Sequence, residues 1–268
     1  MHALGQLHEH SRSDRETFIS IIKGNIKKEF MDNFEKYDTF DRTPYDVESV
    51  MQYSLNAGAK DESKPTMMLH DQSLAFLIGL SKTMTFYDVQ EINKAYQCSA
   101  LCKEDPPVCQ NGGYVLHTCQ CMCPDDLNGT TCNQVKSDKD CGGIIDLDWN
   151  QYESIPSDKY PWKYRTNKRC VWMIRGPSDS NIKLTIKKLN LSVSKGQACY
   201  HWLEIKYNLV GQSGIRRCNN PSAEEITEIT TTDSVDKNIM ILTFDSKISK
   251  DIKLPKDDPG MLLEVKVV

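Results

Sequence analysis

The distribution of cysteine constrains the fold of this chain more than any other feature of its sequence. Eleven cysteines occur in 268 residues, and none of them precedes Cys98. Seven lie between Cys98 and Cys132, and the remaining four are Cys141, Cys170, Cys199 and Cys218. Cysteine at this density indicates disulfide bonds formed in an oxidising compartment. We therefore expect a secreted, extracellular protein with bridged modules in its C-terminal part.

Charge and hydropathy predict neither a nucleic-acid partner nor a membrane span. The chain is mildly acidic, with a net charge of −4 from 33 Lys+Arg and 37 Asp+Glu. No basic stripe indicates nucleic acid, and no apolar run has the length of a membrane span. Two glycosylation sequons, at Asn128 and Asn190, agree with secretion.

The first nine residues, Met1-His2-Ala3-Leu4-Gly5-Gln6-Leu7-His8-Glu9, match the end of the zinc motif H-E-x-x-H-x-x-G-x-x-H. In this motif two histidines four residues apart share one face of a helix and bind zinc. A third histidine six residues further along would face away from the metal, so the helix must end between them. Gly5 is suited to the positive φ that ends a helix. The alternative is that His2 and His8 are unrelated histidines near a terminus.

Two further stretches favour the metal motif. Ser11-Arg12-Ser13-Asp14-Arg15 follows His8-Glu9, and Ser49-Val50-Met51-Gln52-Tyr53 lies about forty residues beyond. Together with His2-Ala3-Leu4-Gly5 they resemble the astacin family of metzincin zinc endopeptidases, in which the second stretch is the Met-turn beneath the metal. The arrangement with later modules resembles nematode astacins.

The resemblance implies a role for each matching residue. His2 and His8 would bind zinc, and Met51 would form the floor under them. Tyr53 would act as a fifth ligand and then donate a hydrogen bond to the tetrahedral oxyanion. Glu9 would meet the N-terminus freed by propeptide removal; the alternative is a solvated charged turn.

The resemblance also implies that the first zinc histidine and the catalytic glutamate precede Met1. We therefore expect the chain to lack the N-terminal half of the catalytic domain and, as given, to be inactive. Residues 91–98 resemble the last helix of that domain, which the sequence Thr85-Phe86-Tyr87-Asp88 would begin with a capping box. Phe86, Val89, Ile92, Asn93 and Tyr96 are predicted to share one face of it. Cys98 would be the odd cysteine, because its partner also lies upstream.

Six cysteines in 99–133 form a separate compact unit. Spacing alone leaves fifteen possible pairings, and a zinc site in Cys119-x-Cys121-x-Cys123 is the less favourable alternative. Cys109-Gln110-Asn111-Gly112-Gly113 and the later cysteine spacing resemble an EGF-like module. That resemblance implies the bridges Cys102–Cys119, Cys109–Cys121 and Cys123–Cys132.

Residues 141–268 are rich in predicted strands, several with alternating apolar residues. We expect strands at 169–174, 182–186, 202–206, 239–244 and 261–267. These strands and the cysteine spacing resemble a CUB domain, which implies the bridges Cys141–Cys170 and Cys199–Cys218. Many CUB domains bind calcium through acidic loop residues, but His201 and Lys247 occupy two of the matching positions. Because neither is a good ligand for a hard cation, we expect no calcium site here.

The predicted fold class is multidomain. It combines the C-terminal half of an α+β metzincin catalytic domain (1–98), a small disulfide-rich EGF-like module (99–133) and an all-β CUB sandwich (141–268). The predicted function is secreted, zinc-dependent hydrolysis of internal peptide bonds, with protein or peptide substrates and extracellular protein partners of the EGF-like and CUB modules. The alternative is a non-catalytic extracellular binding or adhesion protein. An upstream open frame reading His-Glu-x-x before His2 would discriminate between them.

Overall fold

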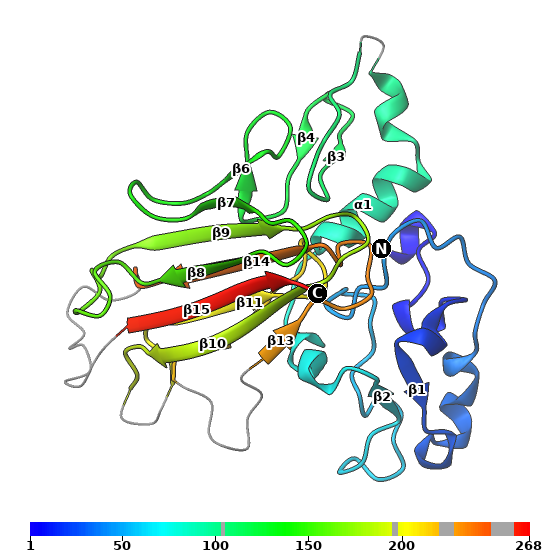
Figure 1. Ribbon diagram of the computed structural model, residues 1–268. Coiled ribbons are helices and arrows are strands. Elements are labelled where there is room, and N and C mark those ends of the chain that lie inside the picture. The colour runs from blue at the N-terminus through cyan, green and yellow to red at the C-terminus, as the bar shows by residue number, and fades with distance from the viewer. Residues whose placement is uncertain (103–104, 195–197, 220–227, 248–259) are drawn as a thin grey trace. The chain divides into compact units, whose positions relative to one another are not determined.

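The computed structural model describes residues 1–102, 105–194, 198–219, 228–247 and 260–268 (Figure 1). The chain forms two compact units. Unit 1 comprises Met1–Pro106 and Leu116–Cys119, and unit 2 comprises Pro107–Val115 and Gln120–Val268. The predicted EGF-like segment, 99–133, therefore contributes to both units. Within the described ranges, every helix is too short or too polar to cross a membrane.

Unit 1 consists mainly of short 3-10 turns around a small apolar core. Its antiparallel sheet pairs β1 (Ile19–Ile21) with β2 (Met67–Leu69). Its α-helix, α1, spans Phe86–Ala95. The 3-10 turns are η1 (His2–Leu4), η2 (Glu9–Ser11), η3 (Arg15–Thr17), η4 (Lys23–Asn25), η5 (Lys28–Phe34), η6 (Gln72–Leu77) and η7 (Cys98–Leu101). The side chains that close the core include Ile19, Ile26, Tyr45, Met67 and Leu77, all nearly inaccessible to solvent.

The capping box of α1 is confirmed, and of the residues predicted to share one face of the helix only Asn93 is buried. Thr85 Oγ1 accepts the backbone N–H of Asp88, and Thr85 N–H donates to the Asp88 carboxylate. The buried positions of the helix are Tyr87, Asp88, Gln90 and Asn93. The helix turns this face inward because the Asp88 carboxylate also binds Ser49 in the preceding loop. A buried polar contact, and not apolar periodicity, therefore sets the orientation of the helix.

The cysteine-rich segment has two small ladders. In unit 2, β3 (Tyr114–Val115) pairs with β4 (Cys121–Met122), and β5 (Leu127–Asn128) pairs with β6 (Gln134–Val135). The disulfides of this segment are Cys102–Cys119, Cys109–Cys121 and Cys123–Cys132. These are the pairs that the EGF-like resemblance implies. Cys98 is a free thiol in the structure.

Residues 141–268 form two sheets whose strands overlie one another in Figure 1. One sheet has the order β13-β10-β15-β8, and the other has the order β12-β11-β14-β9-β7. All neighbouring strands are antiparallel except β7 and β9, which are parallel. The strands are β7 (Gly143–Asp146), β8 (Tyr152–Pro156), β9 (Arg169–Arg175), β10 (Ile182–Asn190), β11 (Trp202–Lys206), β12 (Ile215–Arg217), β13 (Glu228–Thr230), β14 (Ile239–Asp245) and β15 (Gly260–Val267). The five predicted strands are confirmed as β9, β10, β11, β14 and β15.

Alternation of side chains places the core between the sheets. Along β10, Ile182, Leu184 and Ile186 are buried, while Lys183 and Thr185 between them are half-exposed. This period of two is the pattern of a strand with one face on a core and one toward solvent. The disulfides Cys141–Cys170 and Cys199–Cys218 lie in the same domain.

Within unit 2 the cysteine-rich segment packs onto the five-stranded sheet. Leu127 and Cys132 join a buried apolar cluster with Val171, Met173 and Ile241. Beside this cluster, Asp126 reaches the sheet and is 2% exposed. Its carboxylate forms ion pairs with Lys206, at 2.6 Å, and with Arg169, and it also accepts a hydrogen bond from Thr243.

The charges around Asp126 balance the cost of its burial. Burial by itself raises the pKa of this carboxyl, but Lys206 and Arg169 outweigh that effect and the pKa is lowered. The Lys206 side chain is itself only 7% exposed, so each buried charge depends on the other. A buried charge that loses its partner destabilises a fold more than the intact pair stabilises it.

We expect Asp126→Asn to destabilise unit 2 by about 3–5 kcal/mol, because Lys206 would keep a buried charge without a counter-ion. Asp146→Asn is the matched control, since Asp146 pairs with Arg175 at 2.6 Å but its side chain is 67% exposed. The control should lose no more than about 1 kcal/mol. Denaturant unfolding of the full chain measures both, and equal losses would show that burial of Asp126 is not the cause. The pKa of Asp126 is lowered in the folded chain. The difference in stability between the unmodified chain and Asp126→Asn should therefore shrink as the pH falls below about 4, where Asp126 of the unfolded chain takes up a proton.

Candidate metal and substrate site

A single reversal of the chain brings the two motif histidines together. Residues His2–Leu4 form one 3-10 turn, which ends at Gly5 with φ 77°, in the left-handed region. The predicted helix end at Gly5 is therefore confirmed, although the turn is 3-10 in geometry. The ring centroids of His2 and His8 lie 4.7 Å apart.

Backbone carbonyls orient both imidazoles. His2 Nδ1 lies 3.0 Å from the Gln6 oxygen, and His8 Nδ1 lies 2.9 Å from the Met51 oxygen. Because a carbonyl oxygen only accepts, Nδ1 of each ring carries the proton and donates it. In this tautomer the lone pair of Nε2 is free to bind a metal. Metal-binding histidines are commonly held in this way, with the other ring nitrogen bonded to a carbonyl.

The environment of His8 keeps its ring neutral. Burial lowers its pKa; the bond to Met51 raises it less, and nearby His2 lowers it further. A metal ligand must be deprotonated, so a lowered pKa favours binding at neutral pH. The donor set therefore fits two positions of a zinc site.

Tyr53 completes this group of rings. Its centroid lies 4.3 Å from that of His8 and 4.1 Å from that of His10. The side chain is half-buried. Its hydroxyl has no hydrogen bond to any residue that the structure describes, so it is available to a ligand.

Met51 is the junction between the motif and the Met-turn. Its side chain is buried, and its carbonyl oxygen accepts both the His8 ring N–H and the Glu9 backbone N–H, the latter at 3.0 Å. Asp88 of α1 holds the turn itself, accepting from Ser49 Oγ at 2.6 Å and from Val50 N–H at 3.2 Å. Sequence analysis placed Asp88 in the capping box but missed its bonds to the Met-turn, because Ser49 and Val50 lie nearly forty residues away.

Glu9 lies next to the histidines but is held away from solvent. Its carboxylate pairs with Arg12 at 3.0 Å and accepts the Asp46 N–H at 2.7 Å. Burial raises the pKa of Glu9 to about 8, against the opposing effects of Arg12 and the Asp46 N–H. A cavity of 60 Å³ borders Glu9, and its lining includes the further acids Asp41, Asp46, Asp88 and Glu91. The alternative of a solvated turn does not fit this environment, because the Glu9 side chain is only 13% exposed and is paired with Arg12.

His10 is a second residue that sequence analysis missed. It is fully buried, its ring lies 5.3 Å from that of His8, and its Nε2 bonds to the Asn33 carbonyl at 3.0 Å. Its Nδ1 is buried without a hydrogen-bond partner among the described residues. Burial lowers its pKa to about 4, so the ring is neutral and supports Tyr53 by stacking. Its position two residues after His8 was the available signal.

Two histidines do not complete a catalytic zinc site. Across the described ranges, no group of three or more His, Cys, Asp or Glu residues has the arrangement of a metal site. The structure thus brings His2, His8 and Tyr53 together but supplies two metal ligands where three are usual.

The CUB positions that could hold calcium are occupied by other interactions. His201 is fully buried, and its Nδ1 lies 2.9 Å from the Tyr164 hydroxyl. Lys247 forms an ion pair with Asp138 at 2.9 Å. A neutral imidazole bound to a phenol and a lysine ammonium provide no oxygen ligands for a hard cation.

Comparison with known families agrees with this geometry. Residues 1–97 match the family model of astacin, a peptidase family, and residues 141–252 match that of the CUB domain. Residues 1–97 are thus similar to the astacin peptidase family, and residues 141–252 are similar to CUB domains.

Several zinc metalloproteinases are similar to this chain. It is 31% identical over 262 residues to zinc metalloproteinase nas-36 of Caenorhabditis briggsae, covering 94% of this chain and 41% of that protein. It is 34% identical over 229 residues to nas-36 of Brugia malayi, covering 81% of this chain and 38% of that protein. High choriolytic enzyme 1, a hatching enzyme zinc-protease from Oryzias latipes, is 31% identical over 34% of this chain and 46% of its own, with a TM-score of 0.33. The chain therefore spans less than half the length of these relatives.

We expect the chain to show no calcium binding tighter than millimolar, because His201 and Lys247 cannot coordinate the ion. Isothermal titration of the full chain with calcium is the measurement, with magnesium as the control for weak surface binding. A saturable calcium isotherm at micromolar concentration would contradict the assignment.

Proposed function

We propose that this chain carries part of the active site of a secreted zinc endopeptidase that hydrolyses internal peptide bonds. The observation that carries the proposal is the convergence of His2, His8 and Tyr53, with both imidazole Nδ1 atoms bonded to carbonyls. The astacin match and the zinc metalloproteinase relatives support the reaction class.

In this proposal the histidines bind the metal through Nε2. Zinc in such a site supplies Lewis acidity toward water and toward the scissile carbonyl. The remaining histidine and the general-base glutamate would lie upstream of Met1 in a longer protein. Met51, through its carbonyl, holds the His8 ring in the tautomer that leaves Nε2 free.

Tyr53 has the role of oxyanion donor. Its phenol oxygen has no intramolecular partner among the described residues, and its ring is held between two histidines. A donor held in place before the reaction stabilises negative charge as it develops on the substrate oxygen.

Glu9 has a structural role in the same proposal. Its buried carboxylate borders an acidic cavity of 60 Å³, which has room for a small cationic group. The ammonium group of a processed N-terminus, the partner that the resemblance implies, has the matching charge. Such a contact would stabilise the ionised form of Glu9.

A binding function is the second candidate, and the packing of unit 2 favours it. The EGF-like segment and the CUB sandwich share one apolar cluster and the Asp126 ion pairs, so they would present a fixed surface to extracellular proteins. The proposed glycosylation sites agree with secretion, since Asn128 is exposed and Asn190 is half-buried at the end of β10.

Metal content distinguishes the two candidates in the 268-residue chain. We expect weak zinc binding that His8→Ala removes, because one of only two ligands is lost. His70→Ala is the control, since this histidine of the same unit bonds to Ser20 and Thr17 instead. Zinc titration measures both variants, and a zinc affinity unchanged by His8→Ala would place the site elsewhere.

Activity is tested on a longer protein in which the upstream coding sequence supplies His-Glu-x-x before His2. We expect chelator-sensitive cleavage of casein by that protein and none by the 268-residue chain. In the longer protein Tyr53→Phe should keep its zinc but lower kcat by about 10²–10³-fold, as the loss of an oxyanion donor does. An upstream frame without the motif, or no cleavage by the longer protein, would favour the binding function. An unchanged kcat in Tyr53→Phe would instead remove the oxyanion role of Tyr53.

A further inference from the structure

A run of basic residues in the CUB domain has no part in the proposed active site. It lies between β8 and β9, in the sequence Lys159-Tyr160-Pro161-Trp162-Lys163-Tyr164-Arg165-Thr166-Asn167-Lys168-Arg169. These eleven residues contain five Lys or Arg and no Asp or Glu, in a chain whose net charge is −4. The average charge of the chain therefore conceals a strongly basic segment.

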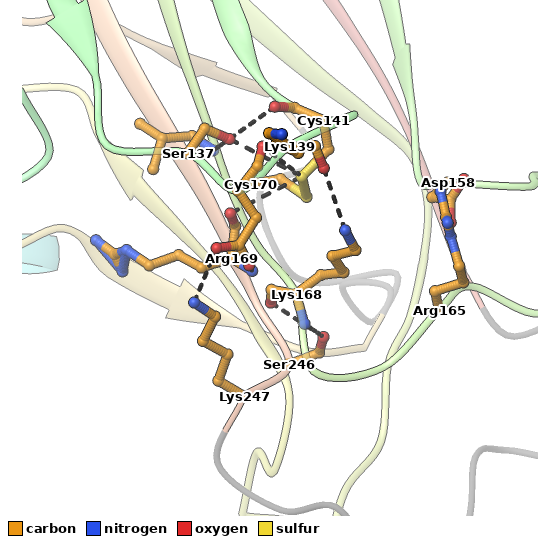
Figure 2. The surroundings of a disulfide bond; sticks show 12 residues. Ser137, Lys139, Cys141, Asp158, Arg165, Lys168, Arg169, Cys170, Ser246 and Lys247 are labelled. Atoms are coloured by element: carbon orange, nitrogen blue, oxygen red, sulfur yellow. Dashed lines mark hydrogen bonds and ion pairs between the residues drawn. A yellow bond between two sulfur atoms is a disulfide. The ribbon is translucent and has the colours of Figure 1, made fainter.

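The fold adds two more cations to this segment. Lys168 Nζ donates to the Lys139 carbonyl at 3.1 Å, and the backbone N–H of Ser246 donates to the Lys168 carbonyl at 2.8 Å. Lys247, which follows Ser246, therefore lies beside Lys168. Figure 2 shows these side chains gathered around the Cys141–Cys170 disulfide. We define the basic surface as Lys139, Lys159, Lys163, Arg165, Lys168 and Lys247.

The carboxylates nearby do not neutralise this surface. Arg165 pairs with Asp158 and Lys247 pairs with Asp138, and Asp140 lies within electrostatic range of Arg165. Three carboxylates thus face six cations, which leaves an excess of three positive charges. Four lysines of the basic surface form no ion pair with any described residue: Lys139, Lys159, Lys163 and Lys168.

The lowered pKa values of Asp158 and Asp138 reflect the positive potential of the basic surface. The pKa of Asp158 is lowered first by its bond to Arg165, and Lys159 and Lys168 add to the effect. The pKa of Asp138 is lowered first by the backbone N–H of Arg169 and then by Lys247. Lysines distant in sequence therefore act on the same acids.

An aromatic side chain stands among the cations. Trp162 lies between Lys159 and Lys163 in the sequence, and it is 76% exposed. A single exposed aromatic side chain is common on protein surfaces, so Trp162 supports a ligand contact only together with the lysines beside it. The face of an indole ring suits the C–H face of a sugar, while the lysines around it suit anionic groups.

We propose that the basic surface binds a sulfated polysaccharide of the extracellular matrix or cell surface. Clusters of Lys and Arg of this length are typical of heparin-binding patches. Five of the six cations are exposed, Lys168 is half-exposed, and all are carried on flexible side chains, which suits a linear polyanion with repeated charges. A folded acidic protein would need a complementary surface of fixed shape, and a polysaccharide would not.

The experiment uses the full chain and immobilised heparin. In the variant Lys159→Gln/Lys163→Gln/Lys168→Gln, three of the unpaired cations are lost. We expect binding at physiological salt to weaken at least about tenfold, and the slope of log K against log salt to fall by roughly 2–3, because fewer counterions are released. The thermal midpoint should not change, since Lys159 and Lys163 are exposed and Lys168 is half-exposed.

The matched control makes the same charge change elsewhere in the CUB domain. Lys183→Gln/Lys187→Gln/Lys266→Gln removes three lysines from β10 and β15, of which Lys183 and Lys187 pair with Glu228 and Glu264. This variant should keep most of the heparin affinity. An equal loss in both variants would overturn the proposal, because binding would then follow net charge alone.

Two further measurements test the chemistry of the ligand. Trp162→Ala should weaken heparin binding several-fold without changing the salt slope, since no charge is lost. Poly-glutamate of similar charge should bind much more weakly than heparin. Binding of poly-glutamate as tight as that of heparin would show that the surface recognises acidic polypeptides, and an unchanged affinity in Trp162→Ala would remove the sugar-stacking contact; either result overturns the polysaccharide assignment.

Discussion

The candidate site depends on the carbonyl oxygen of Met51. This oxygen accepts the Nδ1–H of His8 and the backbone N–H of Glu9, and it thereby joins two stretches separated by 43 residues. Since the oxygen only accepts, it determines which nitrogen of His8 is protonated and in which direction the other one faces. The same contact places the Glu9 carboxylate against Arg12 and the N–H of Asp46. One backbone oxygen therefore orients a proposed metal ligand and locates a buried acid.

Local patterns in the sequence predicted much of the fold correctly. The helix end at Gly5, the capping box at Thr85 and the five longer strands of the CUB sandwich all depend on neighbouring residues, and all were predicted correctly. The shorter strands, such as β7 and β12, have too few alternating positions to distinguish them from loops. Periodicity is a reliable guide only where an element is long enough to repeat its pattern.

The errors concern buried polar residues. The apolar spacing of α1 does not identify its buried positions, which include Asp88 with its bond to Ser49 of the Met-turn. His10 and Asp126 were also missed, and each is buried against partners distant in sequence. A pattern that counts apolar residues assigns such side chains to the surface, since polar groups are rarely buried without partners. Their partners become visible only when the chain is folded.

The basic residues at the start of β9 show how one run of charge is divided between structure and surface. Arg169 is drawn toward Asp126 and Asp245, where it helps to neutralise a buried carboxylate at the junction with the cysteine-rich segment. The side chain of Lys168, its neighbour, donates to the Lys139 carbonyl and forms no ion pair with a described residue. Arg169 is therefore paired within the fold, while the lysines that precede it in this run form no ion pair with a described residue. At the positions where a calcium-binding CUB domain carries acids, this domain has a buried neutral imidazole and a lysine paired with Asp138, and neither supplies an oxygen ligand for a hard cation.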